Sequence, residues 1–256
     1  MSMSTIIAIN NHKGGVAKTT TCLSLGACLA ELGHTVLLVD LDPQAHLTVS
    51  LGLQSDKLHR TVTDALLANS SLVSVSRESS VFGLDIVPAN RELALVDKIL
   101  YRQKRYEYLL KQRLATMNGN YYDFVLLDCA PAFGALTLNA LTAADLLIIP
   151  MQCEFYAAHS LRQIIKLAKL TQRKTNPGLC YHVLATMYDQ RNKICRLILA
   201  HMKRELSPVL YKTVIGIDTK LRESPAYGRP ITLYAPKTRG ATQYRALAQE
   251  LLNHAG

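Results

Sequence analysis

Short apolar runs alternate along the chain with segments of helical periodicity. The runs are rich in Ile, Leu and Val, which is typical of strands buried on both faces of a sheet. They occupy residues 6–10, 35–39, 84–87, 124–127, 146–149 and 182–187. The helical segments cover residues 21–32, 61–67, 92–117, 136–144, 160–173, 192–206 and 243–252. This alternation predicts a doubly wound α/β fold, with a mostly parallel sheet and helices on both faces.

Local signals mark two of the helix boundaries. Gly33 follows the first helical segment and suits a C-terminal cap, and Thr61 precedes a short one with Asp64 three residues later. Gly and Pro are scattered, no internal repeat is found, and no linker-like stretch divides the chain. We therefore expect a single domain over residues 1–256.

The segment KGGVAKTT stands between the first apolar run and the first helical segment. A strand, a turn of small residues ending in Lys-Thr and then a helix is the layout of a phosphate-binding P-loop. Backbone N–H groups and the helix N-terminus can cradle phosphates, Lys18 can neutralise their charge, and Thr19 can ligate Mg²⁺. The residues expected to bind a nucleoside triphosphate are Lys13, Gly14, Gly15, Val16, Ala17, Lys18, Thr19 and Thr20.

Acidic residues follow two other apolar runs. Asp42 lies in the motif VDLDPQ after the run 35–39, and Asp128 follows the run 124–127. Ligands bind beyond the carboxyl ends of the strands in such sheets, so both residues are expected near the P-loop. Asp128 is placed to hold Mg²⁺, often through water, and Asp42 to orient a water that attacks the terminal phosphate. Each Asp taken alone could instead cap the following helix, and that alternative stays open.

Charge is unevenly distributed along the chain, whose formal net charge is +10. Residues 1–159 carry 12 Lys and Arg against 14 Asp and Glu, whereas residues 160–256 carry 17 against 5. Such segregation favours a polyanionic partner. No apolar run approaches the roughly 18 residues that a membrane-spanning helix needs, and no secretory signal is evident. We expect a cytoplasmic protein with no membrane association.

The basic last third supplies the candidates for nucleic-acid binding. Helical spacing over residues 192–206 could place several of them on one exposed face, although any single one could be an ordinary solvated charge. Their contacts would go mostly to phosphates and would be independent of sequence. The candidates are Arg191, Lys193, Arg196, Lys203, Arg204, Lys220, Arg222 and Arg239.

Taken together, these motifs resemble one family. KGGVAKTT, VDLDPQ and LLDCAP, followed by TMYDQR and by LRESPAYGRPI in the tail, are similar to the ParA/Soj branch of the deviant P-loop ATPases, relatives of MinD. The similarity covers almost the entire chain. It implies an Mg²⁺-dependent ATPase that forms homodimers with ATP, binds nucleoid DNA without sequence preference and is stimulated by a ParB-like partner. It also implies a role in chromosome or plasmid segregation.

The resemblance implies roles for individual residues. Lys13 matches the signature lysine that crosses the dimer interface to the partner's ATP, while Lys18 serves the ATP of its own subunit. With Asp42 they would form the catalytic set, and Thr19 and Asp128 would hold the metal. Gly216 and Asp218 match the positions that contact adenine.

Two departures from the family pattern affect these expectations. Ala17 stands where the family usually has Gly, so its methyl group could crowd the phosphates or strain a conformation that Gly adopts freely. Nucleotide binding could survive this change while hydrolysis slows. The segment IGID, residues 215–218, replaces the family's IPRN, which makes the base contacts less secure.

Two alternative functions remain open at this point. The same fold could position a protein cargo on the nucleoid, because a cargo adaptor is recognised through a surface patch that sequence does not reveal. Alternatively, Ala17 could have produced a nucleotide-gated scaffold with very slow hydrolysis. Residues 246–256 lack the basic amphipathic character that anchors MinD to membranes, which supports the expectation of no membrane partner.

Overall fold

The computed structural model describes residues 4–68, 70–117, 121–154 and 157–255, and its strands form one eight-stranded sheet. The strand order is β3-β4-β2-β5-β1-β6-β7-β8, and every neighbouring pair is parallel except β3 with β4. The strands are β1 (Thr5–Ile9), β2 (Val36–Leu41), β3 (Arg77–Glu78), β4 (Leu84–Val87), β5 (Phe124–Cys129), β6 (Leu146–Gln152), β7 (Cys180–Tyr188) and β8 (Leu210–Gly216).

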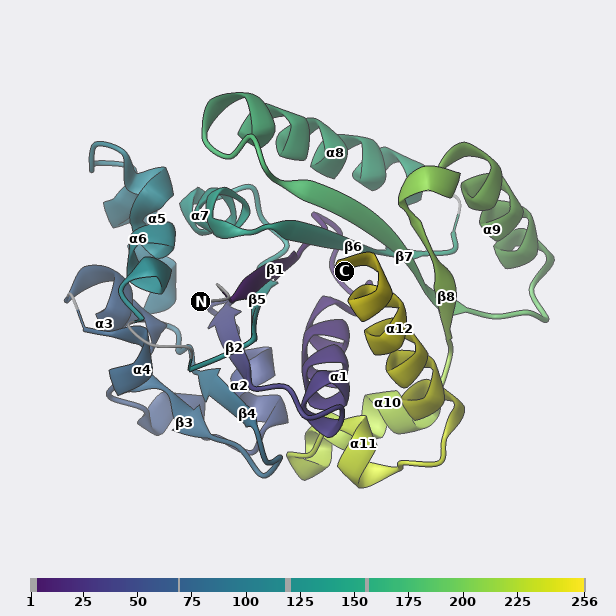
Figure 1. Ribbon diagram of the computed structural model, residues 1–256, viewed down its shortest axis with the longest axis horizontal. Coiled ribbons are helices and arrows are strands. Elements are labelled where there is room, and N and C mark those ends of the chain that lie inside the picture. The colour runs from purple at the N-terminus through teal and green to yellow at the C-terminus, as the bar shows by residue number, and fades with distance from the viewer. Residues whose placement is uncertain (1–3, 69, 118–120, 155–156, 256) are drawn as a thin grey trace.

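Helices cover both faces of this sheet (Figure 1). One face carries α1 (Lys18–Glu31) and α12 (Arg239–Ala255), which pack against each other. The opposite face carries α3 (Val62–Leu67), α5 (Leu93–Leu100), α6 (Leu109–Ala115), α7 (Ala135–Ala143), α8 (Ala157–Lys174) and α9 (Lys193–Glu205). The shorter helices are α2 (His46–Ser50), α4 (Leu72–Val75), α10 (Thr219–Glu223) and α11 (Ile231–Tyr234), with 3₁₀ turns η1 (Ser55–Lys57), η2 (Tyr106–Tyr108), η3 (Ser207–Val209) and η4 (Ser224–Tyr227). The predicted doubly wound α/β fold is confirmed.

Two hydrophobic cores lie on the two faces of the sheet. Successive side chains of a strand point to opposite faces, so Leu37 and Val39 enter one core while Val36 and Leu38 enter the other. All four side chains are fully buried. Burial on both faces explains why the strands appear in the sequence as unbroken apolar runs rather than as an alternating pattern.

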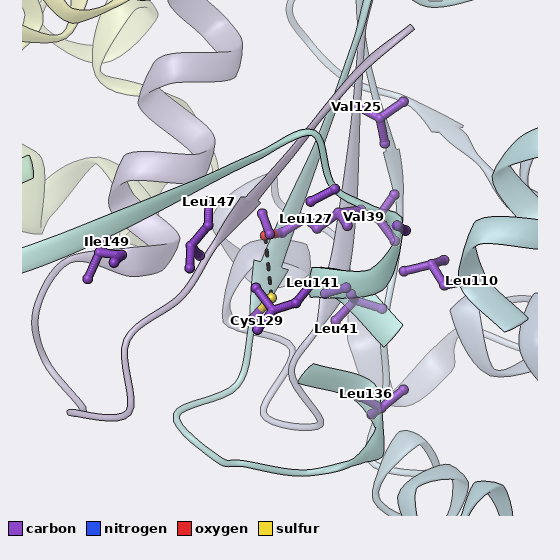
Figure 2. Close-up of a cluster of buried hydrophobic side chains, with 14 of the residues drawn as sticks. Val39, Leu41, Leu110, Val125, Leu127, Cys129, Leu136, Leu141, Leu147 and Ile149 are labelled. Carbon is purple, nitrogen blue, oxygen red and sulfur yellow. Dashed lines mark hydrogen bonds between the residues drawn. The ribbon is translucent and has the colours of Figure 1, made fainter. Parts of the chain in front are cut away.

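Figure 2 shows part of one core, where helices pack on the centre of the sheet. Leu110 of α6 and Leu136 and Leu141 of α7 lie beside strand residues that include Val39 and Leu127. Each large aliphatic side chain that is fully buried contributes about 1.5–3 kcal/mol. This packing fixes α7 against β5, the strand that contains Asp128, and so fixes the loop between them at both ends.

Two predicted helix boundaries are confirmed. The Thr61 hydroxyl accepts from the backbone N–H of Thr63, and the carboxylate of Asp64 accepts from the N–H of Thr61, which completes a capping box. Gly33 follows α1 with φ +91°, a left-handed conformation that favours glycine.

The prediction of one helix over residues 92–117 is wrong. The chain there forms α5 and α6, separated by a turn in which Arg105 has φ +57°. The second helix starts anew where the side chain of Asn139 accepts from the N–H of Leu110 (2.9 Å). A tertiary contact from α7 therefore decides the break, and a helical pattern of charged and apolar residues does not reveal it.

The edge strand β8 was not predicted. It contains Lys212 and Thr213, so its sequence has no unbroken apolar run. Its backbone is held instead by α12, because the carboxylate of Glu250 accepts from the N–H groups of both residues (2.6 and 2.9 Å). None of the described helices combines the length and apolar character needed to cross a lipid bilayer.

Candidate functional site

A cavity of about 560 Å³ opens at the carboxyl ends of the parallel strands. Its lining divides into two groups by origin in the chain. The P-loop side comes from the segments after β1, β2 and β5: Gly14, Gly15, Ala17, Lys18, Thr19, Thr20, Asp42, Gln44, His46 and Pro131. The β8 side comes from β7, β8 and the chain beyond: Met187, Ile215, Gly216, Ile217, Asp218, Leu221, Arg222, Pro225 and Tyr244.

The backbone of the P-loop turns through two left-handed residues before α1 begins. Gly15 has φ +74° and Ala17 has φ +68°. Ala17 is the N-cap residue of α1, and no side chain caps that helix terminus. The N–H groups at the start of α1 are thus available to an anion. The expectation that Ala17 occupies a glycine-like conformation is confirmed, at a cost of about 1 kcal/mol or more.

Lys18 lies on the inner surface of this loop. Its residue is 8% exposed, and its ammonium donates a hydrogen bond to the carbonyl of Lys13 (3.0 Å). Burial lowers the pKa of the Lys18 ammonium, although the negative charge of Asp128 acts in the opposite direction. A bound phosphate would add negative charge next to this buried cation and so stabilise its charged form.

Neighbouring strands and helices hold the P-loop in place. The hydroxyl of Thr186 in β7 donates to the carbonyl of Val16 (3.1 Å), and the side-chain amide of Asn11 donates to the carbonyl of Pro150 (2.8 Å). A hydrogen bond also joins the hydroxyls of Thr21 in α1 and Tyr244 in α12 (3.0 Å). Tyr244 is fully buried and lines the cavity, and its hydrogen bond to Thr21 joins α12 to the helix that follows the P-loop.

Two buried carboxylates face each other across adjacent strands. Asp40 in β2 is the register partner of Asp128 in β5. Asp40 is fully buried and accepts from the N–H and hydroxyl of Thr48 (2.9 and 2.7 Å) and from the N–H of Asp42 (3.1 Å). Burial raises the pKa of Asp40 to about 6 despite these hydrogen bonds. Asp40 was not a predicted site residue, although its position two residues before Asp42, at a strand end, was a usable signal.

Asp128 is in a different situation. It is 1% exposed, and within the described part of the chain neither carboxylate oxygen has a partner at hydrogen-bond geometry. Burial raises the pKa of Asp128 well above its usual range, the charge of Asp40 adds to the rise, and the nearby Thr19 hydroxyl offsets only part of it. A divalent cation beside Asp128 and Thr19 would compensate this carboxylate in its charged form.

The donor set fits a metal that is shared with the nucleotide. Among the described residues, no group of three or more His, Cys, Asp or Glu side chains is arranged to hold a metal without further ligands. Mg²⁺ typically takes one or two carboxylates and completes its octahedral shell with phosphate oxygens and water. One carboxylate, Asp128, and one hydroxyl, Thr19, at the phosphate cradle therefore fit Mg²⁺ bound together with ATP.

Asp42 lines the cavity, as predicted. It is 9% exposed, and one of its oxygens accepts from the N–H of Gln44 (2.9 Å). That hydrogen bond orients the carboxylate at the start of the loop that leads to α2. The structure therefore brings together Lys18, Thr19, Asp42 and Asp128, which three separate motifs contribute.

The loop after Asp128 is anchored by two further contacts. Phe133 stacks on His12 with the ring centroids 4.3 Å apart, which joins this loop to the residue before Lys13. At its other end, Asp97 of α5 accepts from the N–H of Leu136 (2.9 Å), in the first turn of α7. A side chain at Gly134 would collide with that carboxylate, since a Cβ there would lie 2.3 Å from an oxygen.

On the β8 side, Gly216 and Asp218, the positions expected to contact adenine, line the cavity, but their polar groups are already engaged. The N–H of Gly216 donates to the side chain of Gln243 (2.9 Å). The carboxylate of Asp218 caps α10 by accepting from the N–H of Lys220 (2.9 Å), and its second oxygen accepts from the N–H of Gly240 (2.8 Å). Asp218 thus shapes this wall of the cavity by fixing α10 against α12.

Lys13 lies outside the group that lines the cavity. Its ammonium forms an ion pair with Glu154, which follows β6, and both side chains are 34% exposed. The predicted reach of Lys13 to a second subunit therefore requires that this ion pair be released.

The predicted DNA-binding residues fall into two groups. Five are exposed and lie in α9 or just before it: Arg191, Lys193, Arg196, Lys203 and Arg204. On the same helix, Cys195, Leu199 and Met202 are buried. The other three lie in α10 and at the start of α12. Lys220 pairs with Glu223, Arg222 lines the β8 side, and Arg239 donates to the carbonyl of Ile217.

A phosphate cradle between a central strand and its helix, with a buried lysine and a buried carboxylate at the same edge of a doubly wound sheet, defines a P-loop nucleotide-binding protein. Comparison with known families agrees, since residues 4–181 match the family described as the AAA domain. The chain belongs to this AAA-domain family of P-loop proteins.

Similar proteins extend the match to nearly the whole chain. The sporulation initiation inhibitor protein Soj of Bacillus subtilis is 41% identical over 250 residues, which cover 97% of this chain and 98% of Soj. The chromosome partitioning protein ParA of Caulobacter vibrioides is 36% identical over 250 residues, 97% of this chain and 94% of that protein. A solved structure of cobyrinic acid a,c-diamide synthase from Mycobacterium smegmatis, with bound ADP and magnesium, matches with a TM-score of 0.84 and 37% identity, covering 99% of this chain and 96% of that one.

These comparisons confirm the resemblance to the ParA/Soj branch. They also agree with the cofactors, ATP and Mg²⁺, because the same Mycobacterium smegmatis protein was solved with a bound ATP analog and magnesium as well. The chain is thus a P-loop ATPase related to chromosome-partitioning proteins. The roles of its individual residues are proposals.

Proposed function

We propose that this protein is a partition ATPase whose ATP-bound homodimer binds double-stranded DNA without sequence preference and segregates a chromosome or plasmid. The observation that carries the proposal is the pair of lysines in one P-loop. Lys18 is buried against the phosphate cradle, while Lys13 stands half-exposed at the rim, where a second copy can approach. If lysines from two subunits bind the same triphosphate, the dimer forms only when ATP is bound.

Hydrolysis in this proposal uses residues that the fold already brings together. Lys18 and the N–H groups of the P-loop bind the phosphates, and Asp42 orients the attacking water. Thr19 and Asp128 would hold Mg²⁺, which when bound neutralises charge on the phosphate oxygens. The stacked pair His12 and Phe133 joins the P-loop to the loop after Asp128. A movement of that loop when the terminal phosphate is lost would therefore shift the residues next to Lys13.

DNA binding is assigned to the exposed basic face of α9 and the turn before it. The α9 side chains that face the core are apolar, which leaves the cations on the outer surface. Lys220 and Arg239 extend the proposed surface toward α10 and α12. If about six phosphates are neutralised, DNA affinity should fall roughly 10³-fold between 50 and 200 mM salt.

We place the protein in the cytoplasm, on the nucleoid, with a ParB-like protein as the activator of ATP hydrolysis.

The test is the oligomeric state under nucleotide. Sedimentation with ATP and Mg²⁺ should show a dimer that ADP does not support, and DNA should be retained only in the ATP state. Lys13→Ala should keep ATP affinity within about threefold and lose the dimer, because that side chain lies outside its own cavity. Lys212→Ala, an exposed lysine of β8, is the matched control. A protein that stays monomeric with ATP, or a dimer that survives Lys13→Ala, would contradict the proposal.

A further inference from the structure

The helix α10 carries two cations that point in different directions. Lys220 donates to the carboxylate of Glu223 (2.7 Å) and lies over the ring of Tyr234, 5.8 Å from its centroid. Arg222, two positions further along, lines the nucleotide cavity beside Leu221 and Pro225. Positions two apart on a helix differ by about 200° around its axis, so one cation faces outward when the other faces the cavity.

Neighbouring contacts fix this rotation of α10. The carboxylate of Asp218 caps the helix and also accepts from the N–H of Gly240 at the start of α12. Leu221 is 7% exposed and packs over the same glycine, where a Cβ would lie only 2.8 Å from its side chain. Both contacts go to Gly240, so the start of α10 is fixed against α12 and with it the position of Arg222 at the cavity wall.

The chemistry of this wall suits the nucleoside half of ATP rather than its phosphates. Most side chains that line the β8 side are apolar, among them Met187, Ile215, Leu221 and Pro225, and its acidic residue Asp218 already accepts two backbone hydrogen bonds. The N–H groups of the helix start and the buried lysine belong to the P-loop side. A planar guanidinium stacks on aromatic rings and donates hydrogen bonds in its plane, which a base and a ribose can both accept. In the part of the chain that the structure describes, Arg222 forms no ion pair with an acidic side chain, unlike Lys220.

We infer that Arg222 is a nucleotide-binding residue that contacts the base and ribose of bound ATP, and that it is not a DNA contact. This revises its sequence-based assignment to the DNA-binding set. The inference rests on the ATP site of the proposed function and is independent of dimer formation and DNA binding.

The experiment compares two ligands that share their phosphates. The full-length protein is titrated calorimetrically with ATP and, separately, with inorganic tripolyphosphate, which lacks base and ribose, both with Mg²⁺. Arg222→Ala should weaken ATP binding about three- to tenfold and leave tripolyphosphate binding unchanged. Arg222→Met, which keeps the aliphatic stem, should lose as much as Arg222→Ala. Arg229→Ala is the matched control, since that exposed arginine lies in the same segment and outside the cavity lining.

Each other result overturns the inference. An equal loss for ATP and tripolyphosphate would put the guanidinium on the phosphates, and full affinity in Arg222→Met would make the role one of packing. Unchanged ATP affinity combined with weaker DNA retention would return Arg222 to the DNA surface. Circular dichroism and the Tm of each variant confirm that it is folded. A wild-type protein that binds neither ligand would refute the proposed function itself, which separates the two failures.

Discussion

The two sides of the nucleotide cavity are built in different ways. The P-loop side comes from strand ends and from one contiguous loop, and its chemistry lies in backbone N–H groups, a buried lysine and buried carboxylates. The β8 side comes from an edge strand and from short helices that are held by α12. Its polar groups mostly serve the fold, as Asp218 does in capping α10.

The two sides therefore differ in how many buried ionisable groups they present to a ligand. Buried ionisable groups are concentrated on the P-loop side, where Asp128 and Lys18 are buried together and compensate each other only in part. A bound triphosphate and a cation would stabilise the charged forms of both. The β8 side is mostly apolar, the carboxylate of Asp218 is engaged by backbone N–H groups, and Arg222 is its cationic lining residue. Substitutions on the P-loop side should therefore have larger effects than those on the β8 side, where we expect a loss of no more than about tenfold.

The largest effect is expected for Lys18→Ala. The variant removes a buried ammonium from the phosphate cradle and should lower ATP affinity about 100-fold, since a charge-assisted hydrogen bond contributes about 1.5–3 kcal/mol. Binding is measured by calorimetry with Mg²⁺-ATP, and Lys212→Ala, on the exposed edge of β8, serves as control. If Lys18→Ala lowered ATP affinity less than threefold, the expectation that the P-loop side contributes more to ATP binding than the β8 side would be wrong.

Asp128→Asn should separate stability from function. The nucleotide-free protein should gain about 1–2 kcal/mol at neutral pH, because the variant replaces a buried carboxylate, whose oxygens form no hydrogen bond of good geometry among the described residues, with a neutral amide. The same variant should lose most of the rise in Tm that Mg²⁺-ATP gives the wild type. Thermal unfolding with and without the ligand measures both, and Asp56→Asn at an exposed ion pair is the control. Lower stability without ligand would contradict the prediction.

The pH dependence of the nucleotide-free protein follows from the same burial. The pKa of Asp40 rises from 3.8 to about 6 on folding, so the folded state binds this proton more tightly than the unfolded state does. Its contribution therefore makes the free energy of unfolding fall as the pH rises from about 4 to about 6. Urea unfolding across this range measures it in wild type and in Asp40→Asn. An equally steep fall in the variant would show that another group is responsible.

A smaller effect on ATP turnover is expected for substitutions of Asp97, which lies outside the cavity lining and supports a loop of the P-loop side. Asp97 caps the start of α7 and so holds the loop that follows Asp128. Asp97→Ala should lower the turnover of ATP about fivefold with the Kd for ATP unchanged, because the P-loop itself is untouched. Asp97→Asn keeps an oxygen acceptor and should restore most of the turnover. Phosphate release and calorimetry separate the two quantities, and a changed Kd with normal turnover would contradict the assignment.

The smallest effect is expected for Ala17→Gly. Glycine adopts the left-handed conformation without the strain that alanine has there, and this outweighs the greater conformational freedom of glycine in the unfolded chain. The free energy of unfolding should therefore rise by roughly 0.5 kcal/mol. Ala45→Gly is matched, since Ala45 has φ +54° outside the P-loop, and it should gain similarly without a change in turnover. Faster phosphate release in Ala17→Gly alone would show that the methyl group slows hydrolysis. Equal rates, both stimulated by the partner protein, would remove the scaffold alternative.

Sequence and structure contribute differently to the last third of the chain. The excess of positive charge there is plain in the sequence, and it led to one set of eight candidate DNA contacts. The fold divides that set, because Arg222 is among the residues that line the nucleotide cavity and Arg239 donates to the carbonyl of Ile217. Charge is a property of composition, whereas the direction of a side chain depends on the helix that carries it and on what holds that helix.

The sequence by itself determined the P-loop side, because consecutive residues build a phosphate cradle and the ends of buried strands place Asp42 and Asp128 beside it. It also determined the α/β class, since strands buried on both faces require unbroken apolar runs. Only the tertiary structure decided how the β8 side is held in place, where α5 and α6 are separated, and that Asp40 is buried beside Asp128. Each of these depends on contacts between residues far apart in the chain, as when Asn139 starts α6 or Gly240 fixes α10.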